Sequence, residues 1–303
     1  MRTLLLSDLH SNLEATRAVL ESARSPGFDR VAVLGDLVGY GPSPNEVVAA
    51  VRDLGPVAVI RGNHDKVVAG VERGDDFNPV ALEAARINRL LLRPENLEYL
   101  SALPGGPRTV DGVFAIAHGS PLDEDEYLLD AGRAAAVFEE TGFRVCFFGH
   151  THLPGAFVLK EGAVTPLVPG KPEAVLRLDA RARYLINPGS VGQPRDRDPR
   201  ASYAIHDEAA GEVLFRRVDY PVERSAKRIR ETGLPGALEE PTVPVRRGFI
   251  TAVVLFTVGA GPVRGFAITL GIGIITSVFT ALYVTRVMVE FWYRRRQPAT
   301  VTV

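Results

Sequence analysis

The stretch RTLLLSDLHSNLEATRAVLESAR, residues 2–24, pairs a short apolar run with an amphipathic segment. RTLLLS predicts a buried strand, and the apolar residues of NLEATRAVLESAR recur at i, i+3, i+4 and i+7, which predicts a helix. The alternation continues with a strand at 29–35, a helix at 43–55 and a strand at 56–62. Continuous apolar strands separated by amphipathic helices indicate a largely parallel sheet that is covered on both faces. The fold class is therefore α/β.

The rest of the first two thirds of the chain extends this pattern. Residues 78–103 are expected to be helical with a break at Pro94, and GVFAIAHG at 112–119 and RVCFFGHTH at 144–152 predict two more buried strands. Residues 155–218 change to short β runs separated by turn residues, which indicates antiparallel sheet. The whole predicts a sheet core with parallel and antiparallel parts.

Five of the six histidines stand at the ends of predicted strands, beside Asp, Asn or Gly. In parallel sheets, chemistry gathers in the loops beyond the carboxyl ends of the strands. Imidazole and carboxylate ligands together suit divalent Mn, Fe, Ni or Zn, and the candidates outnumber the ligands of one tetrahedral ion, which suggests two metals. The candidates are Asp8, His10, Asp36, Asn63, His64, His118, His150 and His152.

The ordered motifs DLH, GD, GNHD, HG and GHTH resemble those of the calcineurin-like metallophosphoesterases. GDLVGYGPSPNEVV at 35–48 and INPGSVGQPRDRDPRASYAI at 186–205 are similar to the small bacterial members, and the resemblance covers residues 1–220. It implies a metallophosphoesterase-type α/β/β/α sandwich of two mixed sheets. It also implies a phosphoesterase that uses a hydroxide bridging two divalent metals, with Mn expected first and Fe, Ni, Zn or Mg as alternatives.

The resemblance also implies a ligand set for each metal. One metal takes Asp8, His10, Asp36 and His152. The second takes Asp36, Asn63, His118 and His150, so that Asp36 bridges the pair.

His64 is expected to be catalytic rather than a ligand, because in the family this histidine donates a proton to the leaving oxygen or stabilises its charge. Asp65 is expected to assist by raising the pKa of His64. Asn12 is either a substrate-orienting residue or a helix N-cap, and Ser190 lies either near a phosphate or in a plain turn.

The substrate class is less constrained than the chemistry. Related protein phosphatases and dinucleoside tetraphosphatases carry an Arg soon after the GD motif, whereas this chain reads GDLVGYGP at 35–42. That difference favours a phosphodiesterase or a broad phosphoesterase over a Ser/Thr protein phosphatase or a dinucleoside polyphosphate hydrolase. Arg61, Arg195 and Arg197 are candidates to bind phosphate in its place. A non-catalytic scaffold is disfavoured because every motif is intact.

Charge is distributed unevenly along the 303 residues. From Arg246 onward the chain has seven Arg and one Glu, a charge of +6, so that the preceding residues carry −7 of the net −1. A mildly acidic body disfavours a broad nucleic-acid surface. The single cysteine, Cys146, excludes an internal disulfide and suits a reducing compartment.

The C-terminal part predicts a membrane hairpin. Residues 248–263 and 265–284 carry no charged side chain, and arginines flank the pair on both sides. We expect a phosphoesterase domain at 1–232, a linker at 233–247, two transmembrane helices within 248–293 and a basic tail at 294–303.

The hairpin would anchor a cytoplasmic catalytic domain to the inner or plasma membrane, with lipid and membrane proteins as partners. About 55 residues of this part resemble the last transmembrane part of the SecD protein-export subunit, so that a role in protein export is an alternative.

Overall fold

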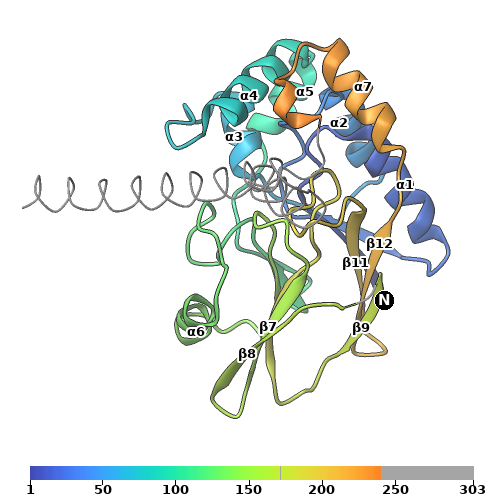
Figure 1. Cartoon of the computed structure of the whole chain (residues 1–303). Helices are drawn as coiled ribbons and strands as arrows, with labels where there is room; N and C mark the ends of the chain where they lie inside the picture. The colour runs from blue at the N-terminus through green and yellow to red at the C-terminus, as the bar shows by residue number, and fades with distance from the viewer. Residues whose placement is uncertain (171, 240–303) are drawn as a thin grey trace, which may run out of the picture. The chain divides into compact units, whose positions relative to one another are not determined.

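The computed structural model describes residues 1–170 and 172–239, and these contain two six-stranded sheets (Figure 1). In the first sheet β1, β2 and β3 run parallel, and β11, β12 and β9 extend it antiparallel from β1. The order is β3 (Ala58–Val59), β2 (Arg30–Val33), β1 (Arg2–Leu6), β11 (Ala201–Asp207), β12 (Glu212–Val218) and β9 (Glu173–Arg177).

The second sheet is also mixed. Its central strands β5, β6 and β10 are parallel, with antiparallel neighbours on both sides. The order is β4 (Arg108–Val110), β5 (Phe114–Ile116), β6 (Val145–Phe147), β10 (Arg183–Asn187), β7 (Gly155–Lys160) and β8 (Ala163–Leu167). The predicted pair of mixed sheets is thereby confirmed.

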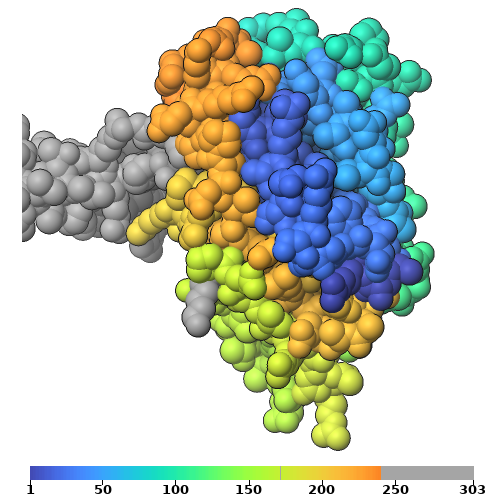
Figure 2. Space-filling model, turned by 90° about the vertical axis from the view of Figure 1, so that its right-hand side faces the viewer, coloured from blue at the N-terminus to red at the C-terminus, as the bar shows by residue number. Residues whose placement is uncertain are grey.

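Helices cover the outer face of each sheet, and in Figure 1 α6 stands apart from the other helices. The helices are α1 (Leu13–Arg24), α2 (Pro44–Asp53), α3 (Asn63–Ala69), α4 (Pro79–Leu91), α5 (Pro94–Ser101), α6 (Ala131–Glu140) and α7 (Val222–Glu231), followed by the 3₁₀ turn η1 (Gly236–Leu238). The predicted break at Pro94 separates α4 from α5. Figure 2 shows the orange α7 lying against the blue α1.

Alternating side chains of the strands build three apolar layers. In β1, Leu4 and Leu6 pack toward the helices of the first sheet, whereas Leu5 points between the sheets. From the second sheet Phe147 also lies between the sheets, while its neighbour Cys146 packs with α6. β1 and β6 therefore each contribute to two layers, which is the reason that their sequences read as continuous apolar runs.

The predicted linker begins inside the packed part of the molecule. Leu234 is buried, and Leu238 packs with it against Ala84 of α4 and Ile229 of α7. The packed domain therefore continues past the predicted boundary at residue 232.

The predicted membrane spans within 248–293 and the basic tail at 294–303 lie outside the described residues. Within the described ranges, none of the helices has the length and apolar character needed to cross a bilayer.

Candidate functional site

The predicted site residues come together where loops from the two sheets meet. Asp8 and His10 follow β1, Asp36 follows β2, and Asn63 and His64 begin α3 just after β3. From the second sheet, His118 follows β5, and His150 and His152 follow β6. The reason is topological, because the carboxyl ends of parallel strands lie at one edge of a sheet.

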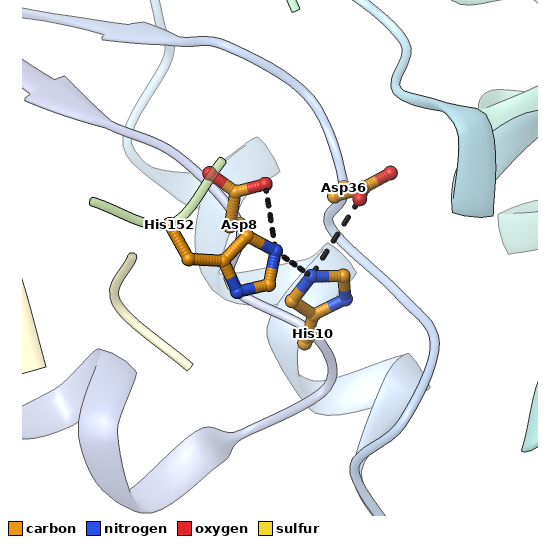
Figure 3. A group of neighbouring side chains, drawn as sticks. All are labelled: Asp8, His10, Asp36 and His152. Carbon is orange, nitrogen blue, oxygen red and sulfur yellow. Dashed lines mark hydrogen bonds and ion pairs between the residues drawn. The ribbon is translucent and has the colours of Figure 1, made fainter. Parts of the chain in front are cut away.

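The first cluster contains Asp8, His10, Asp36 and His152, all buried (Figure 3). One potential ligand atom from each lies within 4.8 Å of the others. His152 Nε2 lies 3.4 Å from Asp8 Oδ1 and 3.1 Å from His10 Nε2, and His10 Nε2 lies 3.5 Å from Asp36 Oδ2. These four residues are the set predicted for one metal.

The second cluster shares Asp36 with the first and adds His118 and His150. Asn63 belongs beside it, because its Oδ1 lies 3.3 Å from His118 Nε2. The structure therefore also brings together the four residues predicted for the other metal.

Asp36 lies between the clusters. Its Oδ2 is 3.5 Å from His10 Nε2 and 3.5 Å from His118 Nε2, while Oδ1 accepts a hydrogen bond from the His64 amide at 2.9 Å. A carboxylate in this position can bridge two cations about 3.5–4 Å apart. Gly62 makes room for it, because a Cβ there would lie 2.2 Å from Asp36 Oδ1.

The histidine tautomers test whether these residues fit a cation. Carbonyl oxygens accept from the Nδ1 atoms of His10 (Val38 O), His118 (Leu34 O) and His152 (Gln193 O), which places the proton of a neutral ring on Nδ1. The Nε2 lone pairs of His10 and His152 then face each other at 3.1 Å. Facing lone pairs repel, and a cation between them turns that repulsion into coordination, so the donor set fits a metal.

Buried charge in the clusters is balanced locally. Burial lowers the pKa of His10 and of His152 well below the ordinary value, so that both rings are neutral at pH 7. Burial opposes ionisation of Asp36, but the nearby His118 and His64 outweigh it and hold the pKa of Asp36 well below its usual range. Burial raises the pKa of Asp8 to about 6. Divalent cations bound in the site would favour the ionised form of both carboxyl groups.

His64 stands beside the clusters, and its ring lies between the rings of Tyr40 and Phe77 at centroid distances of 4.4 and 4.5 Å. Burial lowers the pKa of His64 to about 4. Asp65 is not among the groups that shift this pKa, and its carboxylate accepts hydrogen bonds from the Val38 and Gly62 amides. The pKa of His64 is thus lowered by burial rather than raised, and the hydrogen bonds of Asp65 hold the backbone of the loop.

Of the three candidate arginines, Arg61 and Arg195 differ in their surroundings. Arg61 is paired with Glu124, with Nη2 2.8 Å from Oε1. The exposed Arg195 lies with its Nη atoms 3.5 Å from the hydroxyls of Tyr40 and Tyr127. Burial is the largest cause of the lowered pKa of His152, and the charge of Arg195 is the next. The guanidinium of Arg195 therefore lies near the clusters.

Asn12 and Ser190 have structural partners. Asn12 is the N-cap of α1, since its Oδ1 accepts from the Ala15 amide at 3.1 Å. The Ser190 hydroxyl donates to Asp8 O and accepts from the Gln193 amide, each at 2.8 Å. Gln193 O in turn accepts a hydrogen bond from the His152 ring. The segment 187–193 therefore orients the metal-ligand residues Asp8 and His152 rather than presenting free amides to a phosphate.

Asn88 of α4 gave no signal in the sequence, yet it holds two loops of the site. Its Oδ1 accepts from the Ser11 hydroxyl at 2.6 Å and the Gly39 amide at 3.0 Å, and its Nδ2 donates to Gly41 O at 3.0 Å. The residue is fully buried. It therefore fixes the loop that carries His10 and the loop that carries Tyr40.

Comparison with known proteins agrees with this geometry. A family model described as the calcineurin-like phosphoesterase superfamily domain matches residues 1–211. An uncharacterized protein of Methanocaldococcus jannaschii is 39% identical over 240 residues, covering 78% of this chain and 95% of that protein.

Two solved structures are similar over nearly their whole length. The crystal structure of a metallophosphoesterase from Sphaerobacter thermophilus has 43% identity and a TM-score of 0.70, covering 79% of this chain and 96% of that one. A hypothetical protein from Pyrococcus horikoshii has 21% identity and a TM-score of 0.63 over 78% and 96%, which shows a shared fold. The predicted family resemblance is confirmed.

The C-terminal part is similar to a different protein. The protein translocase subunit SecD of Rhodobacter capsulatus is 51% identical over 55 residues, and a subunit of the same name from Acetobacter pasteurianus is 49% identical over 55 residues. These matches cover 18% of this chain but only 10% and 11% of the relatives, so this chain spans about a tenth of their length.

Proposed function

Because this chain belongs to the calcineurin-like phosphoesterase superfamily and is a metal-dependent phosphoesterase, we propose that it hydrolyses phosphodiesters at a centre of two divalent cations. The observation that supports the dinuclear centre most directly is the position of Asp36 Oδ2, equidistant from His10 Nε2 and His118 Nε2. Asp8 and His152 complete one set of ligands, and Asn63, His118 and His150 complete the other.

When bound, two such cations would polarise the phosphate group and lower the pKa of a water molecule towards roughly 7. The protein residues supply the remaining functions. In the reaction, a bond from the water oxygen to phosphorus forms while the bond from phosphorus to the leaving oxygen breaks, and the leaving oxygen gains a proton.

His64 is proposed to assist the leaving oxygen. It follows the ligand Asn63 and lines the same cavity as Asn63 and His150. With a pKa of about 4 the ring is neutral at pH 7, so it assists by donating a hydrogen bond as charge develops on that oxygen. This role needs no imidazolium in the resting enzyme.

Arg195 is proposed to bind the phosphate group. The sequence has no arginine after the GD motif, and Arg61 is engaged with Glu124. Arg195 remains exposed beside the Tyr40 and Tyr127 hydroxyls, and a guanidinium can bind two phosphate oxygens at once. One such group suits the single negative charge of a diester.

A substrate comparison tests this function. We expect the purified full chain loaded with Mn²⁺ to hydrolyse bis(p-nitrophenyl) phosphate with a higher kcat/KM than p-nitrophenyl phosphate or a phosphoserine peptide. The matched control is Asp36→Asn, which keeps the size of the side chain and removes the bridging charge. Turnover no higher than that of the control would refute the phosphoesterase centre, and a preference for either monoester would refute the diesterase.

A membrane tether is proposed for the C-terminal part. It is supported by the uncharged runs at 248–263 and 265–284, by the flanking arginines and by the similarity to SecD. A cytoplasmic catalytic domain would follow from the positive-inside rule. Carbonate extraction of membranes should leave the protein in the pellet, and its recovery in the supernatant would contradict the tether. Co-purification with translocase subunits that is lost on deletion of residues 240–303 would instead support the export alternative.

A further inference from the structure

A cavity of about 490 Å³ opens beside His64 and is not accounted for by the metal ligands alone. Asn63, His64 and His150 form part of its lining, so the cavity borders the cluster of Asp36, His118 and His150. Its volume lies within the range of about 300–1,000 Å³ that is typical of small-molecule pockets. If His64 assists the leaving oxygen as proposed, the group attached to that oxygen enters this space.

Three aromatic side chains line the cavity: Tyr40, Phe77 and Tyr127. Their rings contact histidines of the site, with centroid distances of 4.4 Å for Tyr40–His64, 4.5 Å for Phe77–His64 and 3.9 Å for Tyr127–His150. Phe77 is only partly buried and Tyr127 is 46% exposed, so both retain surface for a ligand. Aromatic walls favour a planar ring, because ring pairs stack or meet edge to face.

The outer wall of the same cavity is acidic. Among the residues that the structure describes, the carboxylates of Glu72, Asp75, Asp76 and Asp125 line it, together with one basic side chain, that of Arg73. The buried ammonium of Lys66 already pairs with Glu72 at 2.9 Å and with Asp125 at 2.6 Å. Within residues 1–170 and 172–239, no basic side chain forms an ion pair with Asp75 or Asp76.

Such a wall repels a leaving group that carries negative charge of its own. The two charged features of the site therefore act on different parts of a substrate. Arg195 and the metal site interact with the phosphate, and the carboxylates face the leaving group. A further phosphate or carboxylate on the leaving group would approach Asp75 and Asp76 at short range, where like charges are destabilising.

We infer that this cavity is a pocket for a leaving group that is joined through oxygen to the phosphorus and carries a planar, uncharged ring, such as an aryl group or the base of an uncharged nucleoside. The inference rests on the proposed phosphodiesterase function and names its substrate class. It excludes dinucleoside polyphosphates and acidic phosphoproteins as preferred substrates, because their leaving groups are anionic.

Non-hydrolysable ligands test the pocket without turnover. In benzyl(methyl)phosphinate a CH₂ group replaces the ester oxygen, so that there is no P–O–C bond to cleave. This ligand and its 3-carboxybenzyl analogue differ only in one negative charge, and their Kd values for the Mn²⁺-loaded full chain are measured by calorimetry. We expect the carboxylated ligand to bind about tenfold more weakly. The double variant Asp75→Asn/Asp76→Asn should reduce that ratio to about twofold.

Glu139→Gln/Glu140→Gln is the matched control, because it removes two adjacent exposed carboxylates from α6, outside the cavity lining. It should leave the ratio at about tenfold. A ratio that is the same in the wild type and the Asp75/Asp76 double variant would overturn the role of the acidic wall. Since the measurement needs no hydrolysis, this result is distinct from a failure of the proposed function, which would appear as absent turnover of every ester.

The aromatic walls need a second comparison. Cyclohexylmethyl(methyl)phosphinate has a ring of similar size that is not planar, and we expect it to bind at least fivefold more weakly than the benzyl ligand. Phe77→Leu keeps an apolar side chain and should bring the two affinities together. Equal binding of both ligands to the wild type would overturn the preference for a planar ring. Tighter binding of the corresponding thymidine methylphosphinate, in which a CH₂ group replaces the 5′ oxygen, than of the benzyl ligand would identify a nucleoside as the occupant, and the reverse order an aryl group.

Discussion

Replacing Asn88 with alanine should disturb the site from a distance. The side chain makes three hydrogen bonds, to Ser11, Gly39 and Gly41, in a position with no solvent exposure. Each buried bond contributes about 1 kcal/mol net, so the variant should lose about 3 kcal/mol of unfolding free energy. For a domain of this size that corresponds to a Tm lower by about 6–12 °C.

The control is Asn45→Ala. Asn45 also makes three hydrogen bonds, to Leu91 O, the Arg93 amide and Asn96, at 2.7, 2.9 and 2.9 Å. It is partly exposed, so water can replace the lost side chain, and the expected loss is below about 1 kcal/mol. The two variants thus share residue type and bond number and differ in burial.

Urea unfolding followed by circular dichroism gives the stability of both variants, and calorimetric titration gives the Kd for Mn²⁺. Because Ser11 adjoins His10, Asn88→Ala should also weaken metal binding by about tenfold or more, while Asn45→Ala should leave it unchanged. Equal stability losses in the two variants would refute the argument from burial. A destabilised Asn88→Ala protein that keeps the wild-type Kd would refute the positioning role.

Three further predictions concern single side chains. Arg195→Ala should lower kcat/KM for bis(p-nitrophenyl) phosphate by about 10–100-fold, with partial recovery in Arg195→Lys; an effect below twofold would remove Arg195 from phosphate binding. Burial lowers the pKa of His206 in β11 to about 4, so folding favours its neutral form. The contribution of neutral His206 to the unfolding free energy is complete above the unfolded pKa of about 6.5 and is lost as the pH falls toward 4. His206→Phe should therefore flatten the decline of unfolding free energy over that window by up to about 3 kcal/mol. Parallel pH curves for the two proteins would contradict this. Burial raises the pKa of the Cys146 thiol, so iodoacetamide should modify it only after denaturation, and rapid alkylation of the folded protein would show that the β6 layer opens.

The location of the site could be predicted because it follows from strand order. Polar residues after an apolar strand must lie at the carboxyl end of that strand, and parallel neighbours bring those ends together. Asp8 and Asp36 therefore meet, because β1 and β2 are parallel neighbours, whereas His118 follows β5 of the second sheet and reaches Asp36 through the packing of the two sheets. The residue types then indicate the chemistry, since carboxylates and imidazoles at one point suit divalent cations.

The partners that orient the ligands could not be predicted in the same way. Asn88 lies 77 residues from Ser11, and Ser190 lies 182 residues from the backbone of Asp8 that it contacts. Nothing in the local sequence around Asn88 distinguishes it from a surface residue of an amphipathic helix. Its role depends on how α4 packs on the loops, which is a property of tertiary structure.

Motif resemblance assigned a catalytic role to Asp65, and the sequence left Asn12 open between substrate orientation and an N-cap. Both side chains accept hydrogen bonds from backbone amides at helix N-termini, Asp65 as the N3 residue of α3 and Asn12 as the N-cap of α1. Asn is a preferred N-cap residue, and an acidic N3 side chain can bind back to the N-cap amide. A short polar motif thus contains both functional groups and the caps that hold them, and only the hydrogen-bond partners distinguish the two.

Backbone conformation explains why the same residue types recur in this site. Among the residues that the structure describes, ten other than glycine have a positive φ, and seven of them belong to the loops of the site: Asp8, His10, Ser11, Asp36, Tyr40, His150 and His152. The left-handed conformation costs roughly 1–2 kcal/mol per residue, and Asn, Asp and His tolerate it best. Asp36 and the histidines therefore meet two requirements at once, because they offer ligand atoms and accept the turn that aims those atoms inward. A β-branched residue at these positions would strain the backbone, even if another group replaced the lost ligand atom.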